Sequence, residues 1–75
     1  MTEEQMRGRL AKDFPDSDII VNDLTGTEDH WEVHIASSRF VNLTRIQQHK
    51  LVMLAFEEEL KTGEVHALTM KTKEK

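Results

Sequence analysis

Hydrophobic side chains recur every four residues near the start of the chain, from Met6 to Phe14. This spacing keeps them on one side of an α-helix. A capping-box pattern begins at Thr2, and Pro15 cannot continue a helix because it lacks a backbone N–H. The pattern predicts a first helix over residues 3–13.

Two short segments with the pattern of β-strands follow. Residues 19–24 are rich in β-branched side chains. In residues 31–35 a tryptophan, a valine and an isoleucine alternate with polar side chains, which is the period of a strand with one buried face. The polar stretch 26–30, which contains a glycine, is predicted to form the tip of a hairpin between the two strands.

The pattern becomes helical again over residues 44–60, and Gly63 is a natural stop. We expect one long helix whose buried stripe contains Ile46, Val52, Met53, Phe56 and Leu60. The polar positions expected to lie outside this stripe are Gln47, Gln48, Lys50, Glu57 and Glu58. Leu51 and Leu54 are expected on the opposite flank, where they either dock onto another chain or pack beneath residues 37–43.

Residues 65–70 predict a third strand, and residues 70–75 are expected to form a flexible, solvated tail. The order helix, strand, strand, helix, strand implies a three-stranded sheet with helices covering one face. The predicted fold class is therefore α+β, a two-layer sandwich. At 75 residues we expect a single domain, residues 1–75. Its hydrophobic core must stabilise the fold without disulfide bonds.

Composition narrows the candidate chemistry. The chain has no cysteine, so any metal ligands must come from its four histidines and its carboxylates. A formal net charge of -4 argues against general affinity for nucleic acid or anionic membranes. No apolar run approaches the ~20 residues that span a bilayer. The acidic, polar start lacks a signal-peptide or transit-peptide pattern, so we expect a cytoplasmic protein.

Each histidine has a structural interpretation beside a functional one. His30 lies at the expected hairpin tip and His66 at the start of the third strand, where exposed segments often carry function. His34 shares the polar face of its strand and is expected at the surface, while His49 falls within the helical stripe and is expected to be packed. From pattern alone, a structural role is favoured for all four. The order of residues 30–34 is not that of a zinc-hydrolase motif.

Four segments, taken in order, resemble the BolA-like family: Ser37–Phe40, Arg45–Val52, Glu58–Leu60 and Val65–Leu68. The resemblance runs from about residue 19 to residue 73. It implies an α-β-β-α-α-β order similar to a type II KH domain, with a short helical turn near residues 37–43. The chain departs from the family where Asn42 stands in place of a frequent glycine, and Gln48 and Lys50 in place of arginines.

The resemblance implies a non-enzymatic adaptor whose partner is a monothiol glutaredoxin. In this family a [2Fe–2S] cluster is bridged between the two proteins, and the histidine of a His-Ala-Leu element, here His66, is a ligand. The second ligand, from the loop between the first two strands, is here His30. The cluster is not expected to bind stably to this chain alone. The implied role is iron–sulfur cluster trafficking, or iron and redox regulation.

Two other functions stay open. One is nucleic-acid binding and transcription regulation through the KH-like fold, with a basic patch made of Arg39, Arg45, His49 and Lys50. Against it, residues 41–44 supply no G-x-x-G loop to clamp a nucleic-acid backbone. The other is a metal-free interaction module or a weak homodimer. Nothing in the sequence marks a nucleophile, an orienting acid or an oxyanion donor, so no enzymatic turnover is expected.

Overall fold

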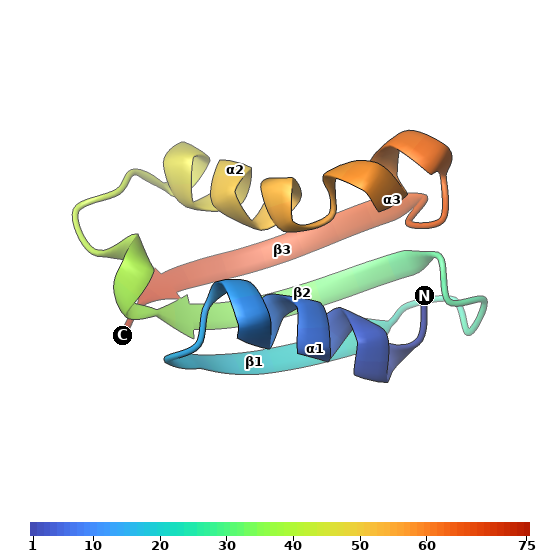
Figure 1. Ribbon diagram of the computed structural model, residues 1–75, viewed down its shortest axis with the longest axis horizontal. Helices are drawn as coiled ribbons and strands as arrows, with labels where there is room; N and C mark the ends of the chain where they lie inside the picture. The colour runs from blue at the N-terminus through green and yellow to red at the C-terminus, as the bar shows by residue number, and fades with distance from the viewer.

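The chain folds into a sheet of three strands and a layer of helices, which confirms the predicted α+β class (Figure 1). The structure is a computed structural model and describes all of residues 1–75. In chain order its elements are α1 (Glu3–Asp13), β1 (Ser17–Asp23), β2 (His30–Ser37), the 3-10 helix η1 (Ser38–Phe40), α2 (Arg45–Ala55), α3 (Glu57–Thr62) and β3 (Ala67–Glu74). The expected short helical turn after the second strand is η1.

The sheet has the strand order β1-β2-β3. β1 and β2 form the predicted antiparallel hairpin, in which Val21 lies opposite Val33. β3 runs parallel to β2, with Ala67 beside His30 and Glu74 beside Ser37. A parallel pair needs a long crossover connection. Here α2 and α3 provide it, and the starts of β2 and β3 consequently lie at the same end of the molecule (Figure 1).

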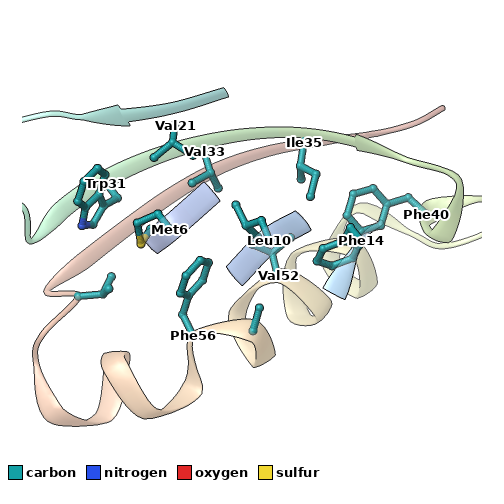
Figure 2. Packing of buried hydrophobic residues seen from close by; sticks show 12 residues of the cluster. Met6, Leu10, Phe14, Val21, Trp31, Val33, Ile35, Phe40, Val52 and Phe56 are labelled. Carbon is teal, nitrogen blue, oxygen red and sulfur yellow. The ribbon is translucent and has the colours of Figure 1, made fainter. Parts of the chain in front are cut away.

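The hydrophobic core lies between the helices and one face of the sheet. Side chains of α1 and α2 meet those of the sheet there, as Figure 2 shows for Met6, Leu10 and Phe14 on one side and Val33 and Ile35 on the other. The remaining members of the cluster are Val21, Trp31, Phe40, Val52, Ala55, Phe56 and Val65. Burying a side chain of this size contributes roughly 1.5–3 kcal/mol. The opposite face of the sheet carries no helix.

Local signals account for the ends of the helices. Thr2 and Thr44 each cap a helix in a complete capping box, with Gln5 and Gln47 as the reciprocal partners. Gly63 ends α3 in the left-handed conformation, with φ 86°. Such a conformation is accessible to glycine at little cost. None of the helices has the length and apolar character required to cross a membrane.

The prediction of one long helix over residues 44–60 is wrong, because the helix is broken at Phe56. Phe56 has φ -119° and ψ 22°, and its N–H donates to the Met53 carbonyl at 3.1 Å. This is a tight 3-10-type bond at the end of α2. The Phe56 side chain is fully buried in the core. The break therefore occurs at the residue that anchors the connection between α2 and α3.

The expected buried stripe of the long helix is also partly wrong. Ile46 is 69% exposed and Met53 is 47% exposed, whereas Gln48, expected to lie outside the stripe, is only 8% exposed. The Gln48 amide donates to the Leu43 carbonyl at 3.1 Å, and its oxygen accepts from the Thr72 hydroxyl at 2.6 Å. A polar side chain with such partners can be buried at little cost. The helix is therefore rotated relative to the orientation that hydrophobicity alone indicates.

The prediction of a flexible tail from residue 70 is also wrong. β3 begins at Ala67 rather than at residue 65 and continues to Glu74, and residues 70–74 pair with β2 along their whole length. Thr72 faces the helices, where its hydroxyl binds Gln48, while Lys71 and Lys73 are exposed. Backbone pairing does not require apolar side chains on the open face of a sheet. The polar end of the chain is therefore a strand.

Candidate functional site

The structure brings together the two histidines that the family resemblance singles out. The ring centroids of His30 and His66 are 5.1 Å apart, and the ring planes are inclined at 49°. His30 is the first residue of β2, and His66 directly precedes β3. Because His30 pairs with Ala67 in the parallel ladder, the two histidines are brought to the same edge of the molecule.

The backbone of Asp29 ties the two histidine segments together. Its carbonyl oxygen accepts hydrogen bonds from the N–H of His66 at 2.7 Å and from the N–H of Ala67 at 3.1 Å. On the other side, Val65 is buried in the core and its N–H donates to the Glu59 carbonyl at 3.0 Å. The backbone on both sides of the exposed His66 ring is thus fixed, although the ring itself is free to contact another molecule.

The side chain of Asp29 orients the ring of His30. Nδ1 of His30 lies 2.8 Å from an Asp29 carboxylate oxygen, and the Thr27 hydroxyl donates to the same oxygen. These hydrogen bonds, first from Thr27 and then from His30, lower the pKa of Asp29 below its usual value. A carboxylate that binds one ring nitrogen of a histidine sets the tautomer in which the other nitrogen keeps its lone pair. Nε2 of His30 is then the ring nitrogen whose lone pair can bind a metal ion.

The pair has the side-chain chemistry of a candidate metal site. Neutral imidazole nitrogens are good ligands for iron, copper and zinc. Nowhere in the chain are three or more His, Asp or Glu side chains grouped so as to hold a metal ion. A metal ion bound at this point would therefore take two ligands from the two histidines, and its other ligands would be water or groups of a second molecule.

The other two histidines lie away from this pair in different surroundings. His34 is on the open face of the sheet, as expected, and its Nε2 lies 3.1 Å from a carboxylate oxygen of Glu32. The hydrogen bonds from His34 and then from Asn22 lower the pKa of Glu32. His49 is partly buried on α2, and its Nε2 atom is buried without a hydrogen-bond partner.

The basic residues proposed as a nucleic-acid patch do not share one environment. The Arg39 guanidinium donates to the Asp13 carbonyl at 2.5 Å and lies 5.0 Å from the ring centroid of Phe14. It is therefore engaged at the end of α1. Arg45 and Lys50 are both exposed on α2. They are five positions apart, a spacing that places side chains on different sides of a helix.

Sequence reasoning did not single out Asp29 as part of the site. Its carbonyl binds the backbone of the His66 segment and its carboxylate binds the His30 ring, so one residue contacts both segments of the site. An acid directly before a candidate histidine ligand was the available signal in the sequence.

Comparison with known proteins shows the family to which the chain belongs. The sequence model of the BolA-like protein family matches residues 10–75. The protein RP812 of Rickettsia prowazekii is 39% identical over 69 residues, which cover 92% of this chain and 88% of that protein. BolA-like protein 1 of Bos taurus is 46% identical over 48 residues, which cover 64% of this chain but 35% of that longer protein.

Solved structures agree with the sequence comparison. The structure of BolA1 from Arabidopsis thaliana superposes with a TM-score of 0.83 and 31% sequence identity. The match covers 95% of this chain and 88% of that one. The family model, the related sequences and the shared fold lead to one conclusion: this chain belongs to the BolA-like protein family.

Proposed function

We propose that this protein is a non-enzymatic adaptor that binds a monothiol glutaredoxin and, through His66 and His30, co-ligates a [2Fe–2S] cluster bridged between the two proteins. The observation that supports the proposal is the pairing of the two rings, with centroids 5.1 Å apart, at one end of the sheet. Membership of the BolA-like family adds to it. The role is iron–sulfur cluster trafficking or iron regulation.

The chain can contribute only part of the ligand set. Iron–sulfur clusters are held mainly by cysteine thiolates, and this chain has no cysteine. The thiolates must therefore come from the partner. Two neutral histidines in place of two thiolates make the cluster less negative, which raises its reduction potential. When bound, the cluster supplies electron-transfer chemistry and an iron–sulfur unit that can be passed on.

The residues of this chain have separate tasks in the proposed complex. His66 is exposed on a short segment between α3 and β3, so it can approach a partner without rearrangement of the core. The Nδ1–H of His30 donates a hydrogen bond to the Asp29 carboxylate, which leaves the lone pair of Nε2 available to bind iron. Because only the neutral ring has a lone pair for a metal, acidification that protonates the histidines should release the cluster.

The test mixes the purified protein with a monothiol glutaredoxin that carries its cluster, and follows visible absorption and circular dichroism. The unmodified protein should change the spectrum, His66→Ala should abolish the change, and His30→Ala should reduce it. His34→Ala is the matched control, because that ring is on β2 but is bound to Glu32 away from the pair. Far-ultraviolet circular dichroism checks that each variant is folded.

Two outcomes would contradict the proposal. If the spectrum does not change and no complex forms, the protein is not such an adaptor. If the spectrum changes equally for His66→Ala and the unmodified protein, the complex exists but the histidine is not a ligand. Binding to nucleic acid that weakens steeply with added salt would instead support the alternative function.

A further inference from the structure

The outward side of α2 carries three exposed large apolar side chains. Besides Ile46 and Met53, Leu54 is 62% exposed. Leu51, for which the sequence left open docking onto another chain or packing beneath residues 37–43, packs against the core. We use the name outer stripe for the side chains that line up along this surface: Ile46, Lys50, Met53, Leu54, Glu57 and Leu60. The outer stripe faces away from the buried side of α2, which contains Gln48, Val52 and Ala55.

The outer stripe is hollowed at its centre. A depression of about 480 Å³ is lined by Lys50, Met53, Leu54, Glu57 and Leu60. The depression lies across the break at Phe56, with Lys50, Met53 and Leu54 on α2 and Glu57 and Leu60 on α3. Its apolar side chains form a surface that apolar side chains of a second molecule can cover.

The charges of the outer stripe are arranged to pair with themselves. Lys50 and Glu57 are equally far, in opposite directions along the chain, from the midpoint between Met53 and Leu54. An antiparallel second copy of the α2–α3 segment, related by a two-fold axis at that midpoint, places Lys50 of each copy against Glu57 of the other. In such an isologous contact every pair occurs twice. The same axis brings the Met53 and Leu54 side chains of the two copies together in the depression.

Neither of these charges is used within the chain. Glu59 binds Arg9 at 2.7 Å, but Lys50 and Glu57 take part in none of the ion pairs of the molecule. An exposed apolar patch flanked by unpaired, complementary charges marks an interaction surface. We propose that the outer stripe is a homodimer interface, in which the α2–α3 segments of two copies pack antiparallel. This proposal does not depend on the function proposed for His30 and His66.

The dimer should be weak, because one helix face per subunit is a small interface. We expect a dissociation constant between about 10 µM and about 1 mM. Sedimentation equilibrium from about 10 µM to about 2 mM measures it for the unmodified protein. Leu54→Asp should abolish dimerisation. Ile20→Asp is the matched control, because Ile20 is similarly exposed, at 57%, but lies on β1.

Charge reversal tests the axis itself. Lys50→Glu turns both attractive pairs into repulsive ones, and Glu57→Lys does the same, so each should weaken the dimer at least about tenfold. The double variant carrying both changes restores the pairs and should dimerise again. A mixture of the two single variants should form a heterodimer, because the two acidic side chains of the first variant then meet the two lysines of the second.

Three results would overturn the proposal. The chain could be monomeric at every concentration, in which case a helix of a different protein is the remaining occupant of the outer stripe. A dimer could be lost in Ile20→Asp and retained in Leu54→Asp, which would place the interface on the open face of the sheet. Lastly, the double charge reversal could fail to restore dimerisation. Since Lys50 and Glu57 are both exposed, thermal unfolding of each variant separates these results from loss of the fold.

Discussion

Replacement of Gln48 by alanine should lower the free energy of unfolding by about 2–3 kcal/mol. The side chain joins α2 to the segment after η1 through the Leu43 carbonyl and to β3 through the Thr72 hydroxyl. Truncation leaves both partners without a hydrogen bond, and an unsatisfied buried polar group costs about 1–3 kcal/mol. A third contact, to the Phe40 carbonyl at 3.4 Å, is long and adds little. A chain of 75 residues has a total stability of roughly 4–11 kcal/mol, so the effect is large.

Urea unfolding followed by the fluorescence of Trp31, the single and buried tryptophan, measures this loss. The melting temperature should fall by about 4–8 °C for each kcal/mol. Lys50→Ala, at an exposed position of the same helix, is the control and should change stability by no more than about 0.5 kcal/mol. Combining Gln48→Ala with Thr72→Val in a double-mutant cycle should give a coupling of about 0.5–1.5 kcal/mol. A loss no greater than that of the control, or no coupling, would refute the role assigned to Gln48.

Three further predictions concern the Arg9–Glu59 ion pair, two glycines and the carboxylate of Asp29. The Arg9 hydrogen bond lowers the pKa of Glu59, so this stabilisation is present above the ordinary glutamate value of about 4.3 and is lost as pH falls through the folded-state value. Glu59→Gln should therefore cost about 1 kcal/mol at pH 7 and much less at pH 3 in urea unfolding. Gly63→Ala should destabilise by about 1 kcal/mol because φ is 86°, whereas Gly8→Ala in α1 should stabilise, both by thermal melting. Asp29→Asn should weaken the cluster-dependent spectral change without unfolding the protein, since the carbonyl bonds to the second histidine segment remain.

Features with local causes were predictable from the sequence. The first helix has the predicted bounds because a capping box at Thr2 and a proline after Phe14 act on their immediate neighbours. The hairpin follows from two short strands and a polar loop that contains Gly26. The rotation of α2 was not predictable, because Gln48 is buried through hydrogen bonds to residues that are distant in the sequence. The strand character of residues 70–74 likewise depends on pairing with β2.

The candidate site was predictable in its residues but not in its geometry. Pattern alone favoured a structural role for every histidine, and the family resemblance singled out His30 and His66. Their proximity depends on the parallel register of β2 and β3, which no local pattern encodes. Asp29 was missed because its part depends on the same register, through its carbonyl bonds to the segment that carries His66.

The parallel pairing of β2 and β3 also leads us to expect an order of assembly. α1, β1 and β2 are neighbours in the sequence, whereas β3 is separated from β2 by η1, α2 and α3. Contacts between distant segments form slowly, because the entropy of closing the loop opposes them. We therefore expect His66 to reach His30 late in folding. The rings of His30 and His66 are therefore apart in a chain that is still being synthesised, and in one whose last strand has detached. In the proposed complex, cluster transfer is then restricted to molecules that have completed their fold.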